Sequence, residues 1–524
     1  MGLYLNPDNA AYQTNLNLPI YVDKSMLIDK LNEFIGRSDN FVCVSRPRRF
    51  GKSIAGNMIS AYYSKGAKSR QMFSNLKISK TDKFEIYLNK LNVIKIDING
   101  FLHNTKNIKN LFGEINATLL QEFIEEFPNI QFESDDTIVH CIQKVYAQTK
   151  QTFVIIIDEY DVLIREQVPS AVFDNYLNFL SGIFKNSTLH PAISLAYLTG
   201  ILPIVRDKIQ SKMNEFDEYS MLDAAQFAEF IGFTNDEVET LCNSHNIDFE
   251  ECRRWYDGYK QYDYEIYSPK SVVTSITRKY FDSYWTTTGS FEALRNYILM
   301  NFEGIKDDVV TMISGGRVGV NVLKYMNTMV DFHSKDDVFT YLIHLGYLAY
   351  NRIEKECYIP NNEIRIEWIN SIEDSPDYKP IMAMINASKA LLQSTIEMDE
   401  QAVATALNEA HMRTTNPLTY NNEASFQSAI GLAYFYANTK YTVIKELPTG
   451  KGYADIALIP YVPNIPAMII ELKNNRTAIG AINQIRERHY DDLLEHYRGD
   501  MLFVGVNYNA DTKEHTCKIE RFEV

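Results

Sequence analysis

Apolar residues in the N-terminal part of the chain gather in three short runs that have the length of buried β-strands. The runs cover residues 41–45, 153–158 and 193–200, and an amphipathic helical pattern follows the first of them. The second run is apolar up to its last residue, which is typical of a central parallel strand buried on both faces. Strands that alternate with helices in this way predict an α/β domain with a parallel sheet.

From about Gly232 the alternation stops, and we expect a small helical region there. Thr234 and Glu237 have the spacing of a capping box, which predicts the first turn of a helix. The segment Trp255–Tyr259 is rich in aromatic residues. Such residues can form a platform on which bases stack, but we prefer the interpretation that they are buried aromatic residues of a helical lid.

A second pattern in the middle of the chain predicts a winged-helix-like module. An apolar segment from Val338 reaches the turn residue Gly346, and the strand-like segments Cys357–Pro360 and Glu363–Trp368 follow. We expect these two segments to pair as a hairpin. Such a module can dock on a duplex or on the N-terminal domain of its own chain, and the two acids of the second segment argue against DNA.

Two further apolar segments near the C-terminal end are separated by turn residues and predict another hairpin. The middle of the turn lies near Pro463, with Asp455 eight residues before it and Glu471 eight residues after it. In a simple antiparallel register these two acids become cross-strand neighbours, with Cβ atoms about 5 Å apart. Glu471 and Lys473 are two residues apart on one strand, so both point to the same face. The spacing therefore gathers two carboxylates and one ammonium.

The loop after the first strand has the composition of a phosphate-binding loop. Its sequence is Arg-Pro-Arg-Arg-Phe-Gly-Lys-Ser, from Arg46 to Ser53, and a helical pattern follows. In such loops backbone N–H groups hold the phosphates, the lysine (here Lys52) reaches the β/γ oxygens, and the serine hydroxyl ligates Mg²⁺. Arg46 stands where the pattern G-x-x-x-x-G-K-[ST] has its first glycine, and Gly51 is the second. A basic loop that only caps a helix is the alternative.

The ends of the other two strands supply the remaining groups of this candidate site. Asp158 would hold Mg²⁺ directly or through water, and Glu159 would polarise the attacking water. Thr199, near the end of the third strand, is placed to sense a γ-phosphate. Because the carboxyl ends of parallel strands border one ligand crevice, the pattern favours an ATPase over a core strand with solvated acids.

The C-terminal acids have the chemistry of a metal-dependent phosphodiesterase. Asp455 and Glu471 would hold Mg²⁺, which neutralises a scissile phosphate, while Lys473 positions or deprotonates the attacking water. A partly buried ion triad at the end of a sheet is the alternative. Two flanking features favour the metal site: Glu423 opens a helix before the hairpin and offers another carboxylate, and Gln484–Tyr490 lies on a helix after it.

Length, charge and cysteine pattern limit the class of protein. At 524 residues the chain is long enough for about three domains of about 150 residues each. Its formal charge of −15 lowers the expectation of nucleic-acid binding but allows a local basic stripe. The six cysteines have no zinc-ligand spacing. We expect a cytoplasmic protein that does not bind membranes, because no basic and apolar leader and no run long enough for a spanning helix is present.

The ordered motifs of the chain resemble those of the bacterial AAA-ATPase-like family, which carries a C-terminal PD-(D/E)XK nuclease-like domain. In that family an Arg-Pro-Arg-Arg phosphate loop is usual, and Tyr453 stands where an arginine usually follows the glycine of the nuclease part. The segments that carry the resemblance are Tyr21–Ser25, Arg46–Ser53, Asp158–Asp161, Thr199–Gly200, Trp255–Tyr259, Tyr284–Gly289 and Leu345–Leu348, then Glu423, Asp455, Glu471–Lys473 and Gln484–Tyr490.

The resemblance implies an α/β fold in three parts: a P-loop NTPase domain with Walker A and Walker B motifs (1–230), a helical lid with a winged-helix-like region (231–420), and an α/β PD-(D/E)XK nuclease-like domain (421–524). We expect ATP and Mg²⁺ as cofactors, nucleic acid as partner, DNA in preference to RNA, and a chain that can form homo-oligomers. The alternative is an ATP-switched regulatory or scaffold protein whose terminal domain only binds.

The expected site residues fall into three groups. The catalytic residues are Glu159, Asp455, Glu471 and Lys473. The nucleotide-binding residues are Arg46, Gly51, Lys52, Ser53, Asp158 and Thr199, and the metal ligands are Ser53, Asp158, Glu423, Asp455 and Glu471.

Overall fold

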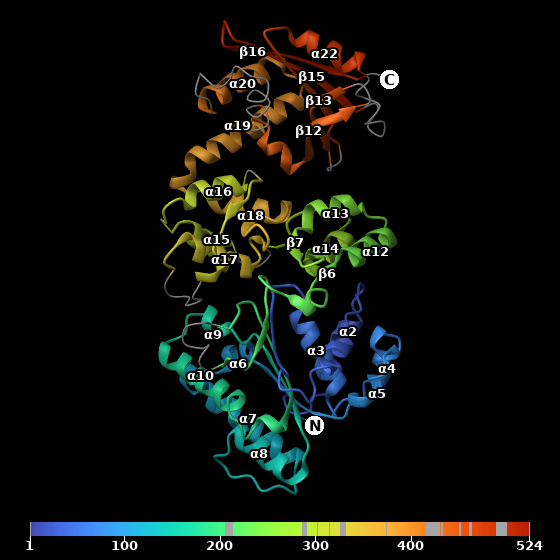
Figure 1. Ribbon diagram of the computed structural model, residues 1–524, viewed down its shortest axis with the longest axis vertical. Helices are drawn as coiled ribbons and strands as arrows, with labels where there is room; N and C mark the ends of the chain where they lie inside the picture. Colours follow the sequence, from blue (N-terminus) through green and yellow to red (C-terminus); the bar gives the residue numbers. More distant parts are fainter. Residues whose placement is uncertain are drawn as a thin grey trace. The chain divides into compact units, whose positions relative to one another are not determined.

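In a computed structural model the chain forms two compact units, residues 1–369 and 370–524 (Figure 1). The division into three parts at residues 230 and 420 stays a prediction. Within the described residues no helix has the length and apolar character needed to cross a bilayer. The structure describes residues 2–204, 213–285, 291–300, 302–313, 315–324, 332–373, 375–414, 430, 433–449, 452–460, 464–488 and 500–522.

The first unit is built on a five-stranded parallel sheet with the order β2-β3-β4-β1-β5. Its central strand β4 therefore lies between β3 and β1, although it follows both in the sequence. The three predicted strands and the parallel arrangement are confirmed. The strands are β1 (Phe41–Ser45), β2 (Asn92–Asp97), β3 (Phe153–Asp158), β4 (Ile193–Gly200) and β5 (Asp217–Tyr219).

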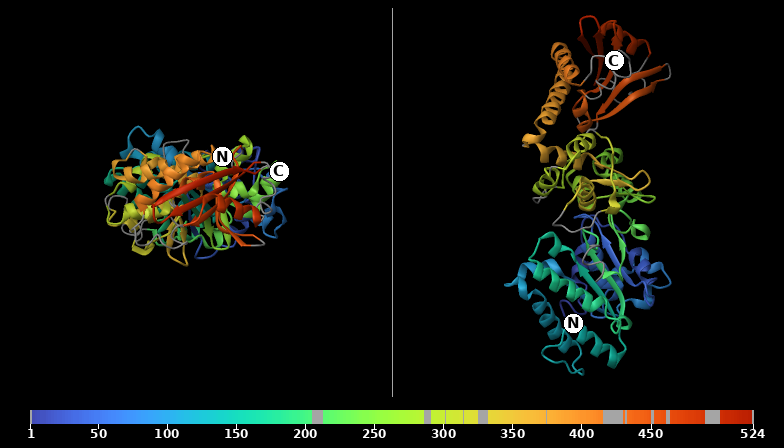
Figure 2. Two further views of the ribbon diagram at one scale, coloured as in Figure 1. Left: turned by 90° about the horizontal axis from the view of Figure 1, so that it is seen from above. Right: turned by 60° about the vertical axis from the view of Figure 1, so that its left-hand side comes forward.

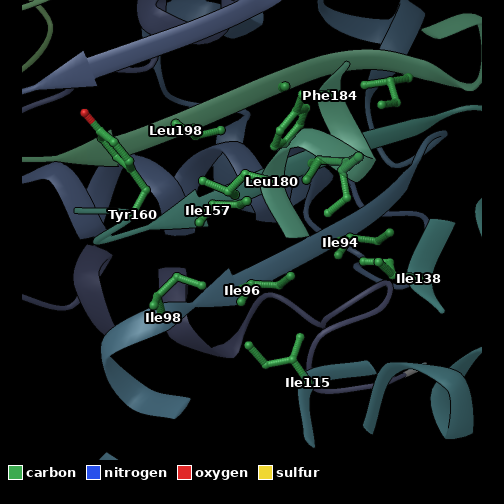
Figure 3. Close-up of a cluster of buried hydrophobic side chains, with 14 of the residues drawn as sticks. Ile94, Ile96, Ile98, Ile115, Ile138, Ile157, Tyr160, Leu180, Phe184 and Leu198 are labelled. Carbon is green, nitrogen blue, oxygen red and sulfur yellow. The ribbon is translucent and has the colours of Figure 1, made fainter. Parts of the chain in front are cut away.

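Helices cover both faces of this sheet (Figures 1 and 2). Helix α3 (Lys52–Tyr63) packs on one face, where Gly56 lies next to Ile156 of β3. On the other face, isoleucines of β2 and β3 pack against Leu180 and Phe184 of α10 (Figure 3). That face is covered by α7 (Leu111–Glu126), α8 (Ile138–Thr149) and α10 (Ser170–Phe184).

Short elements complete this part of the unit and join the strands to the covering helices. They include α1 (Ala10–Leu16), α2 (Met26–Asn32), α4 (Arg70–Phe73), α5 (Phe84–Tyr87), α6 (Ile98–Asn104) and α9 (Val162–Arg165). Because each buried aliphatic or aromatic side chain contributes about 1.5–3 kcal/mol, the two apolar faces of the sheet hold the layers together.

A small helical region follows the parallel sheet, as predicted. The capping box is present: Glu237 accepts a hydrogen bond from the Thr234 N–H at 2.9 Å. Trp255 and Tyr259 are buried, which confirms the interpretation as buried aromatic residues, while the role of the region as a lid stays a prediction. The elements are β6 (Phe233–Thr234), α12 (Asn235–His245), α13 (Phe249–Tyr256), β7 (Tyr259–Gln261), β8 (Tyr264–Tyr267) and α14 (Pro269–Arg278), with the strands in the order β6-β8-β7.

The winged-helix-like region contains a helix, a glycine turn and a hairpin, but the hairpin lies one segment earlier than predicted. Strand β10 (Ala349–Asn351) pairs with β11 (Glu356–Tyr358), which pairs in turn with β9 (Val318–Gly319). The helices are α15 (Phe291–Ile298), α16 (Ile305–Ile313), α17 (Lys335–Leu345) and α18 (Asn362–Ile372).

The predicted strand Glu363–Trp368 is wrong, because this segment belongs to helix α18. Its alternating apolar residues fit a strand, yet the side chain of Asn361 accepts the N–H of Ile364 at 3.0 Å and so caps a helix. Glu363 and Glu367 then lie one turn apart and are buried.

The second unit is a five-stranded sheet between two helical layers (Figure 2). Strands β14 and β15 are parallel, and the other neighbours are antiparallel. Helix α22 (Ala478–Glu487) covers one face, and α19 (Lys379–Ile396) and α20 (Glu400–Thr414) cover the other. The predicted domain boundary at residue 420 would separate α19 and α20 from the sheet that they cover. The strands are β12 (Tyr441–Thr449), β13 (Gly452–Pro460), β14 (Ala467–Asn474), β15 (Met501–Asn509) and β16 (Glu514–Arg521).

Candidate nucleotide and metal sites

The loop between β1 and α3 places a buried lysine at the start of a helix. Gly51 has a φ of 93°, a left-handed conformation that favours glycine. Lys52, the first residue of α3, is 8% exposed, and its ammonium donates to the carbonyls of Arg46 at 2.9 Å and Pro47 at 2.8 Å. Burial lowers the pKa of Lys52 to about 8, against the opposing effect of nearby carboxylates, Asp161 first.

Arg46, which stands at the position of the first glycine, has a role that the sequence did not indicate. Its side chain is fully buried, and its guanidinium donates to the carbonyls of Ser45 at 2.8 Å, Tyr219 at 3.0 Å and Phe227 at 3.4 Å. Burial lowers the pKa of Arg46 to about 10. These contacts tie the start of the loop to β5. Binding of nucleotide by Arg46 stays a prediction.

The register of the parallel sheet brings the predicted acid and hydroxyl together. Thr199 of β4 pairs with Asp158 of β3 on one side and with Val44 of β1 on the other. Asp158 is 6% exposed and accepts a hydrogen bond from Ser53. Burial raises the pKa of Asp158, while Ser53 and Lys52 oppose this shift. The buried hydroxyl of Thr199 has no hydrogen-bond partner among the described residues.

Glu159 lies beside this group in an unusual backbone conformation. Its φ is 52°, and its carboxylate forms an ion pair with Arg165 at 2.7 Å. Sequence reasoning missed Arg165. The spacing of Asp161 and Arg165, four residues apart on a helical turn, was the available signal.

A cavity of about 1130 Å³ extends from the phosphate loop. Its lining includes Gly51, Lys52, Ser53 and Glu159 together with apolar residues such as Ile20. This volume can hold a mononucleotide. The lining contains two carboxylates, those of Glu159 and Glu166, and a larger number of basic side chains. This excess of positive charge favours an anionic ligand. The basic residues are Lys24, Arg48, Arg49, Lys52, Arg165 and Lys270.

In the second unit, the hairpin register is the predicted one. Ile456 of β13 pairs with Ile470 of β14, so the next positions in this register are Asp455 and Glu471. The Asp455 carboxylate accepts the N–H of Leu472 at 2.7 Å, which holds it against the neighbouring strand. The prediction that the hairpin brings the two acids together is confirmed.

Lys473 and Gln484 complete a hydrogen-bonded group around Glu471. The Lys473 ammonium lies 3.0 Å from Glu471 Oε1 and 2.6 Å from Gln484 Oε1, and Gln484 Nε2 also donates to Glu471 Oε1. Helix α22 can bring Gln484 this close because Gly505, which pairs with Glu471, lies under its first turn. A Cβ on Gly505 would lie 2.3 Å from the Ala478 carbonyl oxygen.

The donor set fits a hard divalent cation. Glu471 is 2% exposed, and its Oε2 has no hydrogen-bond partner among the described residues. Burial and then Asp455 raise the pKa of Glu471 to about 7, while Lys473 opposes the shift. A buried acceptor without a donor costs about 1–3 kcal/mol, and a cation held by Oε2 and Asp455 would remove this cost.

Glu423, one of the predicted metal ligands, lies outside the described residues, as do His489 and Tyr490 of the flanking segment. In the parts of the chain that the structure describes, no three His, Cys, Asp or Glu side chains gather into a metal-binding group. Among the described residues, the carboxylates of Asp455 and Glu471 are the groups that fit an ion at this position.

The fold and the sites define the class of protein. A parallel sheet whose first strand leads through a basic loop into a helix, with an acid and a hydroxyl at neighbouring strand ends, is a P-loop ATPase-like fold. Residues 16–210 match the family described as predicted AAA-ATPase, and residues 421–517 match the PD-(D/E)XK nuclease superfamily. The chain thus joins a predicted AAA-ATPase domain to a PD-(D/E)XK nuclease superfamily domain, which confirms the resemblance.

A relative from Azotobacter chroococcum mcd 1, named "Uncharacterized protein in vnfD 5'region", is 24% identical over 278 residues. The match covers 52% of this chain and 51% of the relative. The chain therefore spans about half the length of the relative that it matches.

Among solved structures, a Walker-type ATPase of Pyrococcus abyssi is similar with a TM-score of 0.33 and 12% identity, over 66% of this chain and 94% of that one. The ORC2 protein of Aeropyrum pernix, in ADPNP-ADP complexes, has a TM-score of 0.28 and 10% identity, over 67% of this chain and 92% of that one. The ORC1 protein of the same organism, in complex with DNA, has a TM-score of 0.27 and 9% identity, over 73% of this chain and 100% of that one.

Proposed function

We propose that the first domain binds and hydrolyses ATP with Mg²⁺. The observation that carries this proposal is the meeting of Lys52, Ser53, Asp158 and Thr199 at one edge of the sheet, beside a cavity with a basic lining. The N–H groups at the start of α3 would hold phosphate oxygens, and Lys52 would exchange its two carbonyl partners for the β/γ oxygens. Ser53 and Asp158 would hold the ion, and Glu159 would orient the attacking water.

The proposed second activity is Mg²⁺-dependent cleavage of nucleic acid, DNA in preference to RNA. It is supported by Glu471 Oε2, which lies next to Asp455 and Lys473 and has no hydrogen-bond partner in the described parts of the chain. Asp455 and Glu471 would hold the ion, which neutralises the scissile phosphate when bound. Lys473, fixed by Glu471 and Gln484, would position the attacking water or take its proton. The presence of both domains in one chain supports control of cleavage by the nucleotide state.

The ATPase assignment is tested with Glu159→Gln. This variant should bind ATP with parental affinity but hydrolyse it about 10²–10⁴ times more slowly, because the amide cannot activate water. Nucleotide affinity is measured by calorimetry, and hydrolysis by phosphate release. Hydrolysis at the parental rate would show that Glu159 has a structural role only.

The nuclease assignment is tested with a cleavage assay on single- and double-stranded DNA and RNA, with Mg²⁺ and with or without ATP. Asp455→Asn and Glu471→Gln should lose both metal binding and cleavage. Lys473→Met should keep or strengthen metal binding, because it removes a positive charge beside the ion, while cleavage falls. Lys518→Met, on the edge strand β16, where Lys518 pairs with Glu400, is the control and should cleave like the parent. Metal binding without any cleavage would favour the ATP-switched scaffold.

A further inference from the structure

The ion pair of Glu159 gives Arg165 a role in hydrolysis. We propose that Arg165 is a positioning residue that fixes the Glu159 carboxylate for water activation, an inference that rests on the proposed ATPase function. Arg165 ends the short helix α9 and, like Glu159, lines the cavity. Only 7% of its side chain is exposed, so it is held by the fold.

The guanidinium of Arg165 joins two carboxylates. Its Nη2 lies 2.7 Å from Glu159 Oε2, and its Nε lies 3.0 Å from Asp161 Oδ2. Charge-assisted hydrogen bonds of this kind are directional, and the planar guanidinium fixes the relative orientation of the two acids. The position of Glu159 is therefore set by the position of Asp161.

Asp161 is in turn fixed to the strand that carries Thr199. It is fully buried, and its Oδ2 accepts the N–H groups of Ile201 at 3.1 Å and Leu202 at 2.9 Å, directly after β4. A Cβ on Gly200 would lie 2.5 Å from Asp161 Oδ1, so the packing leaves no space beside it. A rigid chain of contacts thus runs from the end of β4 through Asp161 and Arg165 to Glu159.

Glu159 needs such support because Arg165 is the one partner that the described residues give its carboxylate. Its side chain is 34% exposed, and its φ of 52° is costly for a residue with a Cβ. An unrestrained glutamate samples several rotamers, of which few place a carboxylate oxygen at the attacking water. The ion pair uses Oε2, and Oε1 is the oxygen that we assign to the water.

Two variants of the full chain, Arg165→Ala and Arg165→Lys, test the proposal in a steady-state ATPase assay. Arg165→Ala should lower kcat about 100-fold, the effect of displacing a catalytic group by about 1 Å, and leave the KM for ATP within about twofold. Arg165→Lys should recover part of kcat, because one ammonium cannot hold both acids in the same geometry. Arg253→Ala is the control. Arg253 pairs with Asp257, four residues away as in the Asp161–Arg165 pair, and it does not belong to the cavity lining, so this variant should keep the parental kcat.

A double variant separates positioning from direct phosphate binding. If Arg165 acts through Glu159, adding Arg165→Ala to Glu159→Gln should reduce kcat by less than about threefold further. A full additional loss with a raised KM would show that Arg165 binds the phosphates itself and would overturn the proposal. So would a parental kcat in Arg165→Ala.

Two controls keep these results interpretable. Thermal unfolding reports whether Arg165→Ala folds. If its midpoint falls further than that of Arg253→Ala, Arg165→Gln, which keeps hydrogen-bond donors without the charge, carries the test with the same expected split between kcat and KM. Absence of ATPase activity in the parent would overturn the proposed function and this inference together, whereas an active parent with an equally active Arg165→Gln overturns this inference alone.

Discussion

At the scale of single residues, burial moves two ionisable groups of the candidate sites toward neutrality. The pKa of Lys52 falls to about 8 and that of Glu471 rises to about 7, in both cases mainly because burial removes the charged form from water. Shifts of this kind gather at functional sites. Each gives its site a pH dependence that can be measured.

ATP affinity should fall as the pH rises through about 8, because a neutral Lys52 amine cannot pair with the β/γ oxygens. Lys52→Ala should lose measurable ATP binding while the fold is kept, and Lys52→Arg should remove the pH dependence because arginine stays charged. Calorimetric titrations of ATP between about pH 7 and 9 measure this dependence, since the titration lies within this window. Equal affinity in Lys52→Ala and the parent would remove the phosphate-loop assignment.

Glu471 should link metal binding and stability to pH. Its folded pKa of about 7 lies above the ordinary 4.5, so its contribution to folding stability is present below about pH 4.5 and is lost as the pH rises through 7. Without metal, Glu471→Gln should therefore stabilise the protein at pH 8, by about 1–3 kcal/mol, although it loses the metal.

Thermal unfolding at two pH values, with and without MgCl₂, measures both effects. In the parent, Mg²⁺ should raise the unfolding midpoint at pH 8 more than at pH 5.5, since protons compete for Glu471 below about pH 7. Glu514 is exposed, so Glu514→Gln should change neither the stability at pH 8 nor the response of the unfolding midpoint to Mg²⁺. A midpoint shift by Mg²⁺ in Glu471→Gln as large as in the parent would contradict the site.

At the scale of elements, the phosphate loop packs on the region after the parallel sheet. Arg49 donates to the carbonyls of Tyr284 at 2.5 Å and Trp285 at 2.6 Å. Gly346, which ends α17, lies against Pro47 and Trp285. The loop that would hold the phosphates is thus supported by residues about 235 to 300 positions away, contacts that only the tertiary fold creates.

Gly346→Ala should therefore disturb both stability and ATP binding. The added Cβ would lie 2.8 Å from Pro47 and 2.9 Å from Trp285, and the φ of 85° is itself unfavourable for alanine. Gly36→Ala is a matched control, because its φ is 84° and no atom lies within 4 Å of the added Cβ. The control should lose about 1 kcal/mol and keep its ATP affinity, whereas Gly346→Ala should lose about 2–4 kcal/mol and bind ATP more weakly. Equal losses in the two variants would contradict the proposed support.

The elements also show which features sequence patterns can predict. The apolar runs predicted β1, β3 and β4, and the symmetric spacing of Asp455 and Glu471 about the turn predicted their register. These features depend on local periodicity. The strand predicted at Glu363–Trp368 is wrong, because its two acids are stabilised in the interior by groups that are distant in the sequence. Glu363, for example, accepts hydrogen bonds from the N–H of Tyr284 at 2.7 Å and from the hydroxyl of Ser271 at 2.9 Å.

At the scale of the whole molecule, the second unit includes two helices that precede the matched nuclease segment. Glu400, at the start of α20, accepts the N–H of Ile519 at 3.0 Å, and Asn408 accepts that of His515 at 2.8 Å. Leu392 of α19 and Leu407 of α20 belong to the same buried cluster as the sheet. Without these helices one face of the sheet would expose its apolar residues.

The fragment 370–524 should therefore fold alone and unfold cooperatively, whereas the fragment 421–524 should be soluble only in part or unfold without a sharp transition. Circular dichroism with thermal unfolding, and calorimetry with Mg²⁺ on each fragment, measure the difference. Replacing Leu407 by Ala within 370–524 should cost about 2–5 kcal/mol. A cooperative transition at the same midpoint in both fragments would show that α19 and α20 are not part of the folding unit.

Arg46 limits how the phosphate loop can change by mutation. A glycine at this position would complete the common pattern, yet it would leave the carbonyls of Tyr219 and Phe227 without their donors and a cavity where the guanidinium lies. Each buried acceptor left in this way costs about 1–3 kcal/mol. The arginine and its surroundings are thus epistatic: the common glycine becomes acceptable only after β5 and the segment behind it have changed. A phosphate loop that begins with arginine and one that begins with glycine can therefore share one chemistry, although no single substitution converts the first into the second without a loss of stability.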